Sequence, residues 1–255
     1  MNILIVNDDG INCKGIHVLA DRLSEKHNVY VLAPDKDCSA VSHHISIFKN
    51  KNTVLKKYEN NQWGCSGYPA DCTFIGLESN FFKVKFDVVL SGINRGANLG
   101  TDIVYSGTCA GARQAVFNGV PGIALSIDIE DYSETKDEDV KYDAMADFVE
   151  KNLETLISFA RITEPRMFVN VNGGSLDSYK GVKFGKSLSL RRYDDSFEIL
   201  GQGDVLSSRF CPGKNLTICN NDSDLDVVRN GYICINQIYA DPVANEVVDG
   251  ITFKL

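Results

Sequence analysis

Residues 2–10 read NILIVNDDG, an apolar run of strand length that ends directly in two carboxylates and a glycine. Further apolar runs of strand length lie at residues 28–34, 86–90, 122–127 and 167–171. Apolar residues at helical spacing occupy 14–26, 69–82, 107–118 and 145–160. Near-continuous apolar strands that alternate with helices indicate a parallel sheet buried on both faces. We therefore predict an α/β fold, a Rossmann-like, doubly wound, mostly parallel sheet with helices on both faces.

The character of the chain changes after residue 175, where short segments such as VKFGKSLSL and FEIL mix with glycine, aspartate and serine. This pattern indicates hairpins rather than further βαβ units. We predict a catalytic core over residues 1–175, with a hairpin insertion at about 45–64, and a β-rich C-terminal extension over 176–255. In this interpretation the strand at 167–171 ends the sheet. The acidic stretch at 128–139 is expected to be a solvated loop.

Composition narrows the class of partner. The net charge is −8, from 34 acidic and 26 basic residues, which argues against a nucleic-acid polymer or an anionic membrane. A small phosphorylated ligand can still bind through a cation. No apolar run approaches the ~20 residues that span a bilayer, and the first run is too short for a signal peptide, so we expect a cytoplasmic protein. The eight cysteines include no C-x-x-C pair, and we expect free thiols.

Polar residues follow three of the predicted strands. In an open parallel sheet, ligands bind beyond the carboxyl ends of the strands, so these residues are the first candidates for a site. They are Asn7, Asp8, Asp9 and Gly10 after the first strand, Asp35, Asp37, Ser39, Ser42, His43 and His44 after the second, and SGINRGANLG at 91–100 after the third. Carboxylates, hydroxyls and carboxamides are thus expected at one edge of the sheet.

The adjacent acids Asp8 and Asp9 repel each other unless a positive charge lies between them. Oxygen donors of the Asp, Ser and Asn types favour Mg²⁺ or Mn²⁺ over a thiolate-bound metal. A structural explanation stays open beside this one. Asp8 could cap the following helix, and Asp9 could form an Asx turn to Gly10.

The residues YSGT at 105–108 lead into a predicted helix of small residues. Small side chains allow backbone amides to approach a ligand, and hydroxyls at a helix N-terminus favour an anion. A Ser or Thr that only caps the helix is the alternative. A cation site beside an anion site suits hydrolysis of a phosphate ester. The sequence contains no P-loop, no G-x-G-x-x-G after the first strand and no G-x-S-x-G.

Three stretches make the sequence resemble the SurE family, the survival-protein-E 5′/3′-nucleotidases. They are ILIVNDDGI at 3–11, APDKDCSAVSHHIS at 33–46 and LSGINRGANLGTDIVYSGTCAGARQA at 90–115. Weaker similarity covers VPGIALS at 120–126, FVNVN at 168–172 and DSDLDVVRNGYICI at 222–235. The resemblance implies a metal-dependent phosphomonoesterase on a Rossmann-like core. Its expected substrates are nucleoside 5′-monophosphates, with 3′-monophosphates as further candidates, and its expected products are nucleoside and phosphate.

The resemblance also implies roles for individual residues. The metal ligands would be Asp8, Asp9, Ser39 and Asn94, holding one divalent ion per subunit, with Mg²⁺ or Mn²⁺ expected. The phosphate pocket would be Asn94, Asn98, Ser106, Gly107 and Thr108, and the catalytic residues would be Asp8, Asp9 and Asn98. Family members form homodimers or homotetramers through exchanged C-terminal elements, which would suit the β-rich extension here.

The second loop departs from the family's usual S-G-A/S-[NS]-S, since this chain has SAVSHH at 39–44. His43 and His44 could bind phosphate or protonate the leaving group, or they could be ordinary polar residues of the loop. Arg95 could stabilise an anion or be an exposed loop arginine. Trp63 and Tyr68 could stack on a base, although packing in the core or the hairpin is the favoured interpretation.

We predict attack by a metal-activated water, with Asp8 the better candidate to orient or deprotonate it. The mechanistic alternative is a phospho-aspartate intermediate of the haloacid-dehalogenase type, whose D-x-D pattern is replaced here by Asp8-Asp9-Gly10. A non-catalytic regulator that binds nucleotide or metal is a second alternative. A glycosyltransferase is a third, but no separate acceptor domain is apparent.

Overall fold

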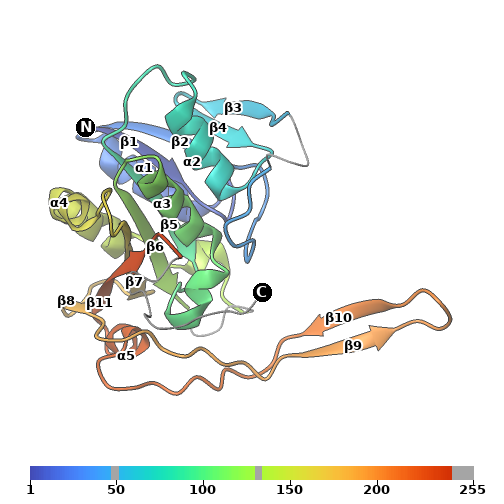
Figure 1. Ribbon diagram of the computed structural model, residues 1–255. Helices are drawn as coiled ribbons and strands as arrows, with labels where there is room; N and C mark the ends of the chain where they lie inside the picture. Colours follow the sequence, from blue (N-terminus) through green and yellow to red (C-terminus); the bar gives the residue numbers. More distant parts are fainter. Residues whose placement is uncertain (47–51, 130–133, 243–255) are drawn as a thin grey trace, which may run out of the picture.

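The computed structural model describes residues 1–46, 52–129 and 134–242 (Figure 1). Its centre is a nine-stranded sheet in the order β3-β4-β2-β1-β5-β6-β7-β11-β8. These strands are β1 (Asn2–Val6), β2 (Asn28–Pro34), β3 (Leu55–Glu59), β4 (Gln62–Cys65), β5 (Val88–Arg95), β6 (Gly122–Asp128), β7 (Met167–Gly174), β8 (Val182–Phe184) and β11 (Ile233–Tyr239). A separate ribbon pairs β9 (Ser196–Leu200) with β10 (Ser207–Cys211).

The connections of β1 locate the crevice where ligands bind. β1 pairs in parallel with both β2 and β5, and the chain first builds outward through β2 and β4. It then returns to the other side of β1 and continues through β5, β6 and β7, again in parallel. The strand order therefore reverses between β1 and β5. In doubly wound sheets the carboxyl ends of the strands at such a point line the binding crevice.

Helices cover both faces of the sheet, which confirms the predicted fold class. On one face, α1 and α4 share an apolar core with the sheet, in which Leu19 and Leu23 of α1 and Met145 and Val149 of α4 are buried. On the other face, α2 and α3 pack against each other. The bounds are α1 (Lys14–Ser24), α2 (Pro69–Glu78), α3 (Gly107–Phe117), α4 (Asp143–Phe159) and α5 (Asp224–Arg229). None of the helices in the described residues is long and apolar enough to cross a bilayer.

Strand β5 is longer than predicted. The apolar run suggested a strand at 86–90 followed by a loop, but β5 continues to Arg95, because Asn94 and Arg95 pair with Ser126 and Ile127 of β6. Ser91 is consequently buried within the sheet. Gly92 has a φ of +136°, and a Cβ there would lie 2.3 Å from the carbonyl oxygen of Leu125. Pairing with β6 thus extends β5 beyond Ser91, where its pairing with β1 ends, although the added residues are polar.

The prediction that the strand at 167–171 ends the sheet is wrong. β11 pairs antiparallel with β7 along its length, from Met167 with Tyr239 to Asn172 with Cys234, and β8 then pairs in parallel with β11. β8 and β11 come from the region assigned to the C-terminal extension, so part of that region completes the main sheet. A boundary between domains at residue 175 stays a prediction.

The hairpin predicted at 45–64 is present in part. β3 and β4 form an antiparallel pair, while residues 47–51 lie outside the described residues. β4 also pairs in parallel with β2, so the hairpin extends the central sheet. Trp63 of β4 packs edge-on against Phe81 at 4.8 Å between ring centroids, as the packing interpretation expected.

The acidic stretch at 128–139, predicted as a solvated loop, binds the start of α1 through Asp137. The carboxylate of Asp137 accepts a hydrogen bond from the amide of Lys14, at the start of α1, and another from the hydroxyl of Tyr142, both at 2.7 Å. Residues 130–133 lie outside the described residues. An acid at a helix N-terminus is favourable because it satisfies an amide and interacts with the helix dipole.

Gly15→Ala should destabilise the chain, because a Cβ at Gly15 would lie 2.0 Å from the carbonyl oxygen of Ile93 in β5. We expect the free energy of unfolding in urea to fall by about 2–4 kcal/mol, since backbone must move to admit the methyl group. The matched control is Gly174→Ala, whose Cβ would meet only Leu176 at 3.5 Å. The control should change stability by no more than about 1 kcal/mol. Equal effects of the two substitutions would contradict this account of the α1–β5 contact.

Candidate active site

Asp8 lies at the carboxyl end of β1 and is 3% exposed. Its Oδ1 accepts a hydrogen bond from the hydroxyl of Thr108 at 2.5 Å, and its Oδ2 accepts one from the amide of Thr108 at 3.1 Å. Its carbonyl oxygen accepts a hydrogen bond from the amide of Cys38 at 2.7 Å. Asp8 therefore joins the end of β1, the loop after β2 and the start of α3.

The start of α3 is built for close approach to Asp8. A Cβ at Gly107 would lie 2.8 Å from the Cβ of Asp8 and 2.9 Å from its Oδ2, so only glycine leaves room for the carboxylate. Ser106 is the N-cap residue, and its hydroxyl accepts a hydrogen bond from the amide of Cys109 at 2.9 Å. The capping alternative thus describes Ser106 correctly. Thr108 instead directs both its hydroxyl and its amide to Asp8.

The structural explanation offered for the two acids does not hold. The Asp8 carboxylate accepts a hydrogen bond from the amide of Thr108 in the first turn of α3, and the N-cap of the following helix α1 is Cys13. The turn after β1 is closed by Asn7, whose side chain bonds both the amide and the carbonyl of Gly10, at 3.2 and 2.8 Å. The two carboxylates instead bind segments that are distant in the sequence, Asp8 the start of α3 and Asp9 the end of β5.

Asp9 faces the end of β5. Its Oδ2 accepts a hydrogen bond from the amide of Arg95 at 3.0 Å, and it is half-buried. The neighbouring Asn94 is 9% exposed, and its side-chain amide donates to the carbonyl of Gly96 at 2.7 Å, which fixes the orientation of the carboxamide. The ends of β1 and β5 therefore present Asp9 and Asn94 side by side at the point where the strand order reverses.

Ser39 is the exposed member of the predicted metal set. Its hydroxyl donates to Oδ1 of Asp37 at 2.6 Å, and its amide donates to the same oxygen at 2.7 Å. The loop that carries it is bound to the rest of the site at two places, Cys38 to Asp8 and Ser42 to the carbonyl of Tyr105. The loop after β2 therefore lies against both β1 and the segment that precedes α3.

Asn98 is 6% exposed and lies in a network of carboxamides. Its side chain donates to the hydroxyl of Ser126 at 2.7 Å, and its amide donates to Oδ1 of Asn172 at 2.8 Å. Its carbonyl accepts from the side chains of Asn170 and Asn172, at 2.8 and 3.2 Å. These bonds from β6 and β7 hold both the backbone and the side chain of Asn98 in place.

The two histidines differ in their surroundings. Nε2 of His43 is 2.8 Å from Oε1 of Gln114, well along α3 from its start, and burial lowers the pKa of His43. The ring of His44 packs on Tyr68, at 4.1 Å between centroids. Tyr68 precedes Pro69, whose Cγ would lie 3.1 Å from a Cβ at Gly107. Of the pair, His44 thus has the closer connection to the start of α3.

Arg95 is partly buried at the end of β5. Its guanidinium donates to the carbonyl of Thr135, so the side chain contacts the segment before α4, while its amide binds Asp9. The alternative of an exposed loop arginine is therefore wrong, because β5 extends to include this residue. A role of Arg95 toward an anion stays a prediction.

The carboxylates at this edge disfavour one another's charge. Burial raises the pKa of Asp8 from 3.8 to about 6; the hydrogen bonds from Thr108 partly offset this, and the charge of Asp37 adds to it. Burial and then the charge of Asp8 hold the pKa of Asp9 well above its usual range, with smaller contributions from Asp137 and Asp37. Such a site is stabilised by a cation.

The donor atoms fit a hard divalent ion. Among the described residues, no group of three or more His, Cys, Asp or Glu side chains is placed to hold a metal. A cation at this edge would consequently draw on the oxygens of Ser39 and Asn94 as well as those of Asp8 and Asp9. An all-oxygen set of this kind suits Mg²⁺ or Mn²⁺.

Four residues that hold the side chains of the site were given no role by the sequence analysis. Ser126, Asn170 and Asn172 hold Asn98, and Asp37 holds Ser39. A signal for two of them was present, because asparagines at alternate positions of an otherwise apolar strand must lie on the same buried face. For the hydrogen bonds that Ser39 donates to Asp37, the sequence offers no signal except that the two residues are close together in the chain.

Comparison with known proteins decides the family. A family model described as survival protein SurE matches residues 3–194. The chain belongs to the SurE family. A protein called 5′-nucleotidase SurE from Petrotoga mobilis is 37% identical over 241 residues, which is 93% of this chain and 92% of that protein. Another of that name from Treponema pallidum is 41% identical over 183 residues, 70% of this chain and 93% of that protein.

A solved SurE protein from Aquifex aeolicus has the same fold. It superposes with a TM-score of 0.78 at 28% identity and covers 95% of each chain. The SurE resemblance inferred from the sequence motifs is thereby confirmed, and so is the Rossmann-like α/β architecture. The region that matches the SurE family model, residues 3–194, therefore includes Asp8 and the segments of Cys38 and Thr108 that bind it.

The stability of the metal-free chain should depend on pH through Asp8. Its folded pKa of about 6 exceeds its ordinary value of 3.8, so the folded state binds the proton more tightly. This contribution is complete below pH ~4 and is lost as the pH rises through about 6. In EDTA we expect the free energy of unfolding to fall by about 1 kcal/mol or more between pH 5 and 7.5.

Urea unfolding across this pH range measures the effect. Asp8→Asn should remove the part of the slope that Asp8 causes, because the carboxamide does not ionise. Asp35→Asn, at an exposed acid of the neighbouring loop, should retain the slope and serves as the matched control. A wild-type stability that stays flat, or rises, between pH 5 and 7.5 in EDTA would refute this assignment.

Proposed function

We propose that this chain is a metal-dependent 5′-nucleotidase, a phosphomonoesterase that releases nucleoside and phosphate from nucleoside 5′-monophosphates. We extend the proposal to 3′-monophosphates as further substrates. The observation that carries it is the pair of adjacent carboxylates at the end of β1, the buried Asp8, which binds the N-terminus of α3, and the half-buried Asp9, which binds the end of β5. The names of the Petrotoga and Treponema relatives support the same activity.

The cation would be held by Asp8, Asp9, Ser39 and Asn94, and we propose one Mg²⁺ or Mn²⁺ per subunit. When bound, a divalent ion there neutralises charge on the phosphoryl group and lowers the pKa of water. The orientation of the ligands comes from the chain itself. Thr108 fixes Asp8, the amide of Arg95 fixes Asp9, and Asp37 holds the hydroxyl of Ser39.

The phosphoryl group would lie between the start of α3 and Asn98. In this proposal the carboxamides of Asn94 and Asn98 and the Ser106–Thr108 turn bind its oxygens. The hydrogen bond that Asn98 donates to Ser126 and its bonds with the asparagines of β7 hold Asn98 before the substrate arrives. Groups held in place in this way cost no reorganisation when charge develops on the phosphoryl oxygens.

The nucleophile is a water that gives its proton to Asp8. Thr108 directs two hydrogen bonds to this carboxylate, which fixes its orientation in the crevice. His44, on Tyr68 beside the start of α3, is the candidate to protonate the leaving oxygen. A phospho-aspartate intermediate is not favoured, because the D-x-D pattern that is typical of such enzymes is missing. A non-catalytic regulator is disfavoured by the enzymatic names of the relatives.

Phosphate release from a panel of nucleoside monophosphates tests the function. With Mg²⁺ or Mn²⁺ we expect turnover of at least one 5′-monophosphate and no turnover in EDTA. Asp8→Asn should lower kcat by about 10³-fold or more, because it weakens the hold on the cation and removes the proton acceptor. Asp35→Asn should leave kcat unchanged. Silence of the wild-type chain across the whole panel with every metal would overturn the nucleotidase proposal.

We propose that the chain assembles as a homodimer or homotetramer through the β9–β10 ribbon, which projects from the body of the molecule (Figure 1). One face of the ribbon is apolar, with Phe197 67% exposed, Ile199 63% exposed and Phe210 packed on Phe197 at 5.4 Å. The other face carries the ion pair of Glu198 and Arg209. A lone two-stranded ribbon is marginal in water, so a second copy that covers its apolar face would stabilise it.

We propose a cytoplasmic location, because all eight cysteines are free thiols in the structure. Proteins exported to oxidising compartments instead tend to pair their cysteines. Five of these thiols are buried, as Cys38, Cys65, Cys72, Cys109 and Cys234. They serve as small apolar residues of the core, which agrees with the use expected from the sequence.

Light scattering after size-exclusion chromatography tests the assembly. The wild-type chain should elute as an oligomer, and the double substitution Phe197→Lys with Ile199→Lys should shift it towards the monomer. Each lysine removes roughly 2 kcal/mol of apolar burial from the contact and adds a like charge. Glu198→Gln, on the opposite face of the ribbon, should leave the oligomer intact. A wild-type chain that is monomeric at micromolar concentration would contradict the proposal.

A further inference from the structure

Asp224 is a buried carboxylate outside the proposed reaction. It is the first residue of α5, and none of its surface is exposed. Its Oδ2 accepts a hydrogen bond from the amide of Gly100 at 2.5 Å. Its Oδ1 accepts from the amide and the hydroxyl of Ser189, at 2.9 and 2.8 Å, and from the amide of Leu225 at 2.8 Å. One side chain thus ties together three segments that are far apart in the sequence.

Gly100 is two residues from Asn98, the carboxamide assigned above to the phosphate pocket. The residue between them, Leu99, is fully buried in an apolar cluster with Leu225, Val227 and Val228 around α5. On its other side, Asn98 is bound by the asparagines of β7, as described. The short segment from Asn98 to Gly100 is therefore held between β7 and α5.

The contact between Gly100 and Ser189 leaves no space for adjustment. A Cβ at Gly100, whose φ is +57°, would lie 2.0 Å from the carbonyl oxygen of Ser189. That carbonyl accepts a hydrogen bond from the amide of Thr101 at 3.1 Å. Because the two backbones touch, a shift of the Ser189 segment displaces the segment that carries Asn98.

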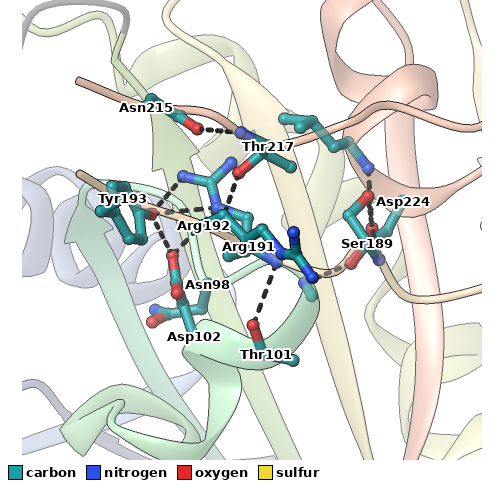
Figure 2. Close-up of polar contacts among 12 residues, drawn as sticks. Asn98, Thr101, Asp102, Ser189, Arg191, Arg192, Tyr193, Asn215, Thr217 and Asp224 are labelled. Atoms are coloured by element: carbon teal, nitrogen blue, oxygen red, sulfur yellow. Dashed lines mark hydrogen bonds and ion pairs between the residues drawn. The ribbon is translucent and has the colours of Figure 1, made fainter.

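The tie continues along the base of the ribbon (Figure 2). Nε of Arg191 is 3.0 Å from Oδ2 of Asp102, and the hydroxyl of Tyr193 donates to the same oxygen at 2.5 Å. The amide of Arg191 donates to the hydroxyl of Thr101 at 3.1 Å. Asp224 extends this row of contacts to Gly100. Of the residues in the row, Gly100 is the nearest in sequence to Asn98.

We propose that Asp224 is a positioning residue, which sets the placement of the Asn98 carboxamide and thereby the affinity of the site for a phosphoryl group. The inference rests on the proposed function in one respect, the assignment of Asn98 to the phosphate pocket. Hydrogen bonds to a carboxylate are roughly twice as strong as those between neutral groups. Asp224 is therefore the strongest tie on the α5 side of the segment.

Asp224→Asn tests the proposal with almost no change in size. The carboxamide has a single acceptor oxygen, and the position of Oδ1 offers it three donors. When the oxygen takes the position of Oδ1, the NH₂ group takes the position of Oδ2 and faces the amide of Gly100. Both groups are donors, so the substitution breaks the hydrogen bond to Gly100 selectively. For the Mn²⁺-loaded chain we expect the Kd for orthophosphate, measured by calorimetry, to rise about 10-fold or more, since small displacements of positioned groups are costly. KM for the nucleotide should rise by a similar factor, with a smaller change in kcat.

Ser189→Ala is the matched control. It removes one hydrogen bond to Asp224 but keeps the amide of Ser189 and the tie to Gly100. We expect a lowered thermal midpoint and a Kd for orthophosphate within about twofold of the wild type. If Asp224 only stabilised the fold, the two variants would lose phosphate affinity in proportion to their loss of thermal stability. That result would overturn the proposal.

A double-mutant cycle with Asn98→Ala identifies the route of the effect. If Asp224 acts through Asn98, Asp224→Asn should change the Kd for orthophosphate less than about twofold when Asn98 is already alanine. Independent effects that multiply would overturn the proposal, as would wild-type affinity in Asp224→Asn. Should Asp224→Asn fail to fold, Asp224→Ser removes the same charge, leaves room for a water, and should show the same loss of affinity.

The readout also separates this inference from the proposed function. A wild-type chain that binds orthophosphate but hydrolyses no nucleotide would overturn the nucleotidase, and the Kd values would still decide the role of Asp224. A wild-type chain that hydrolyses nucleotides with phosphate affinity unaffected by Asp224→Asn would overturn the inference alone. A Mn²⁺-loaded wild-type chain that does not bind orthophosphate would overturn it as well.

Discussion

The carboxylate of Asp8 accepts two hydrogen bonds from Thr108 at the start of α3, and the other parts of the site depend on this contact. It fixes α3 to the end of β1, and it requires glycine at position 107. The carbonyl of the same residue binds Cys38, which brings the loop after β2 to the same edge. A helix N-terminus is a favourable place for one negative charge, and here the protein supplies that charge itself. The substrate phosphate would therefore enter a region whose first anion is already in place.

This arrangement explains why the site calls for a cation. A helix N-terminus and two hydrogen bonds lower the cost of ionising Asp8, yet burial still raises its pKa to about 6. Asp9 and Asp37 add negative charge within the same crevice. Only oxygen donors surround them in the proposed set, so the proposed divalent ion would offset this repulsion. The same ion would then reverse the local field and admit a phosphate monoester to a chain of net charge −8.

The sequence predicted the elements that the sheet imposes and missed contacts between distant segments. Strands β1, β2 and β6 and the start of α3 were predictable, because apolar runs and small residues mark them. The extent of β5 to Arg95 was not, since its last residues are polar and their pairing with β6 has no local signal in the sequence. Asp137 in an acidic stretch and Asp224 in the C-terminal region carry no local signal of their roles. Each acts on a residue more than a hundred positions away, Lys14 and Gly100 respectively, and only the folded chain brings them together.

The predicted division into a catalytic core and a C-terminal extension separates residues that are in contact in the structure. The family model ends at residue 194, yet β11 completes the main sheet beside β7, and Asp224 binds the segment that follows Asn98. Residues beyond the matched region thus contact the segment that follows Asn98, while the β9–β10 ribbon projects from the same part of the chain (Figure 1). Ser189 and Arg191, at the base of that ribbon, bind Thr101 and Asp102, so the base of the ribbon is connected to the segment that carries Asn98. A second copy that binds the ribbon, as proposed, would therefore act on a segment connected to Asn98, the residue proposed to bind phosphate.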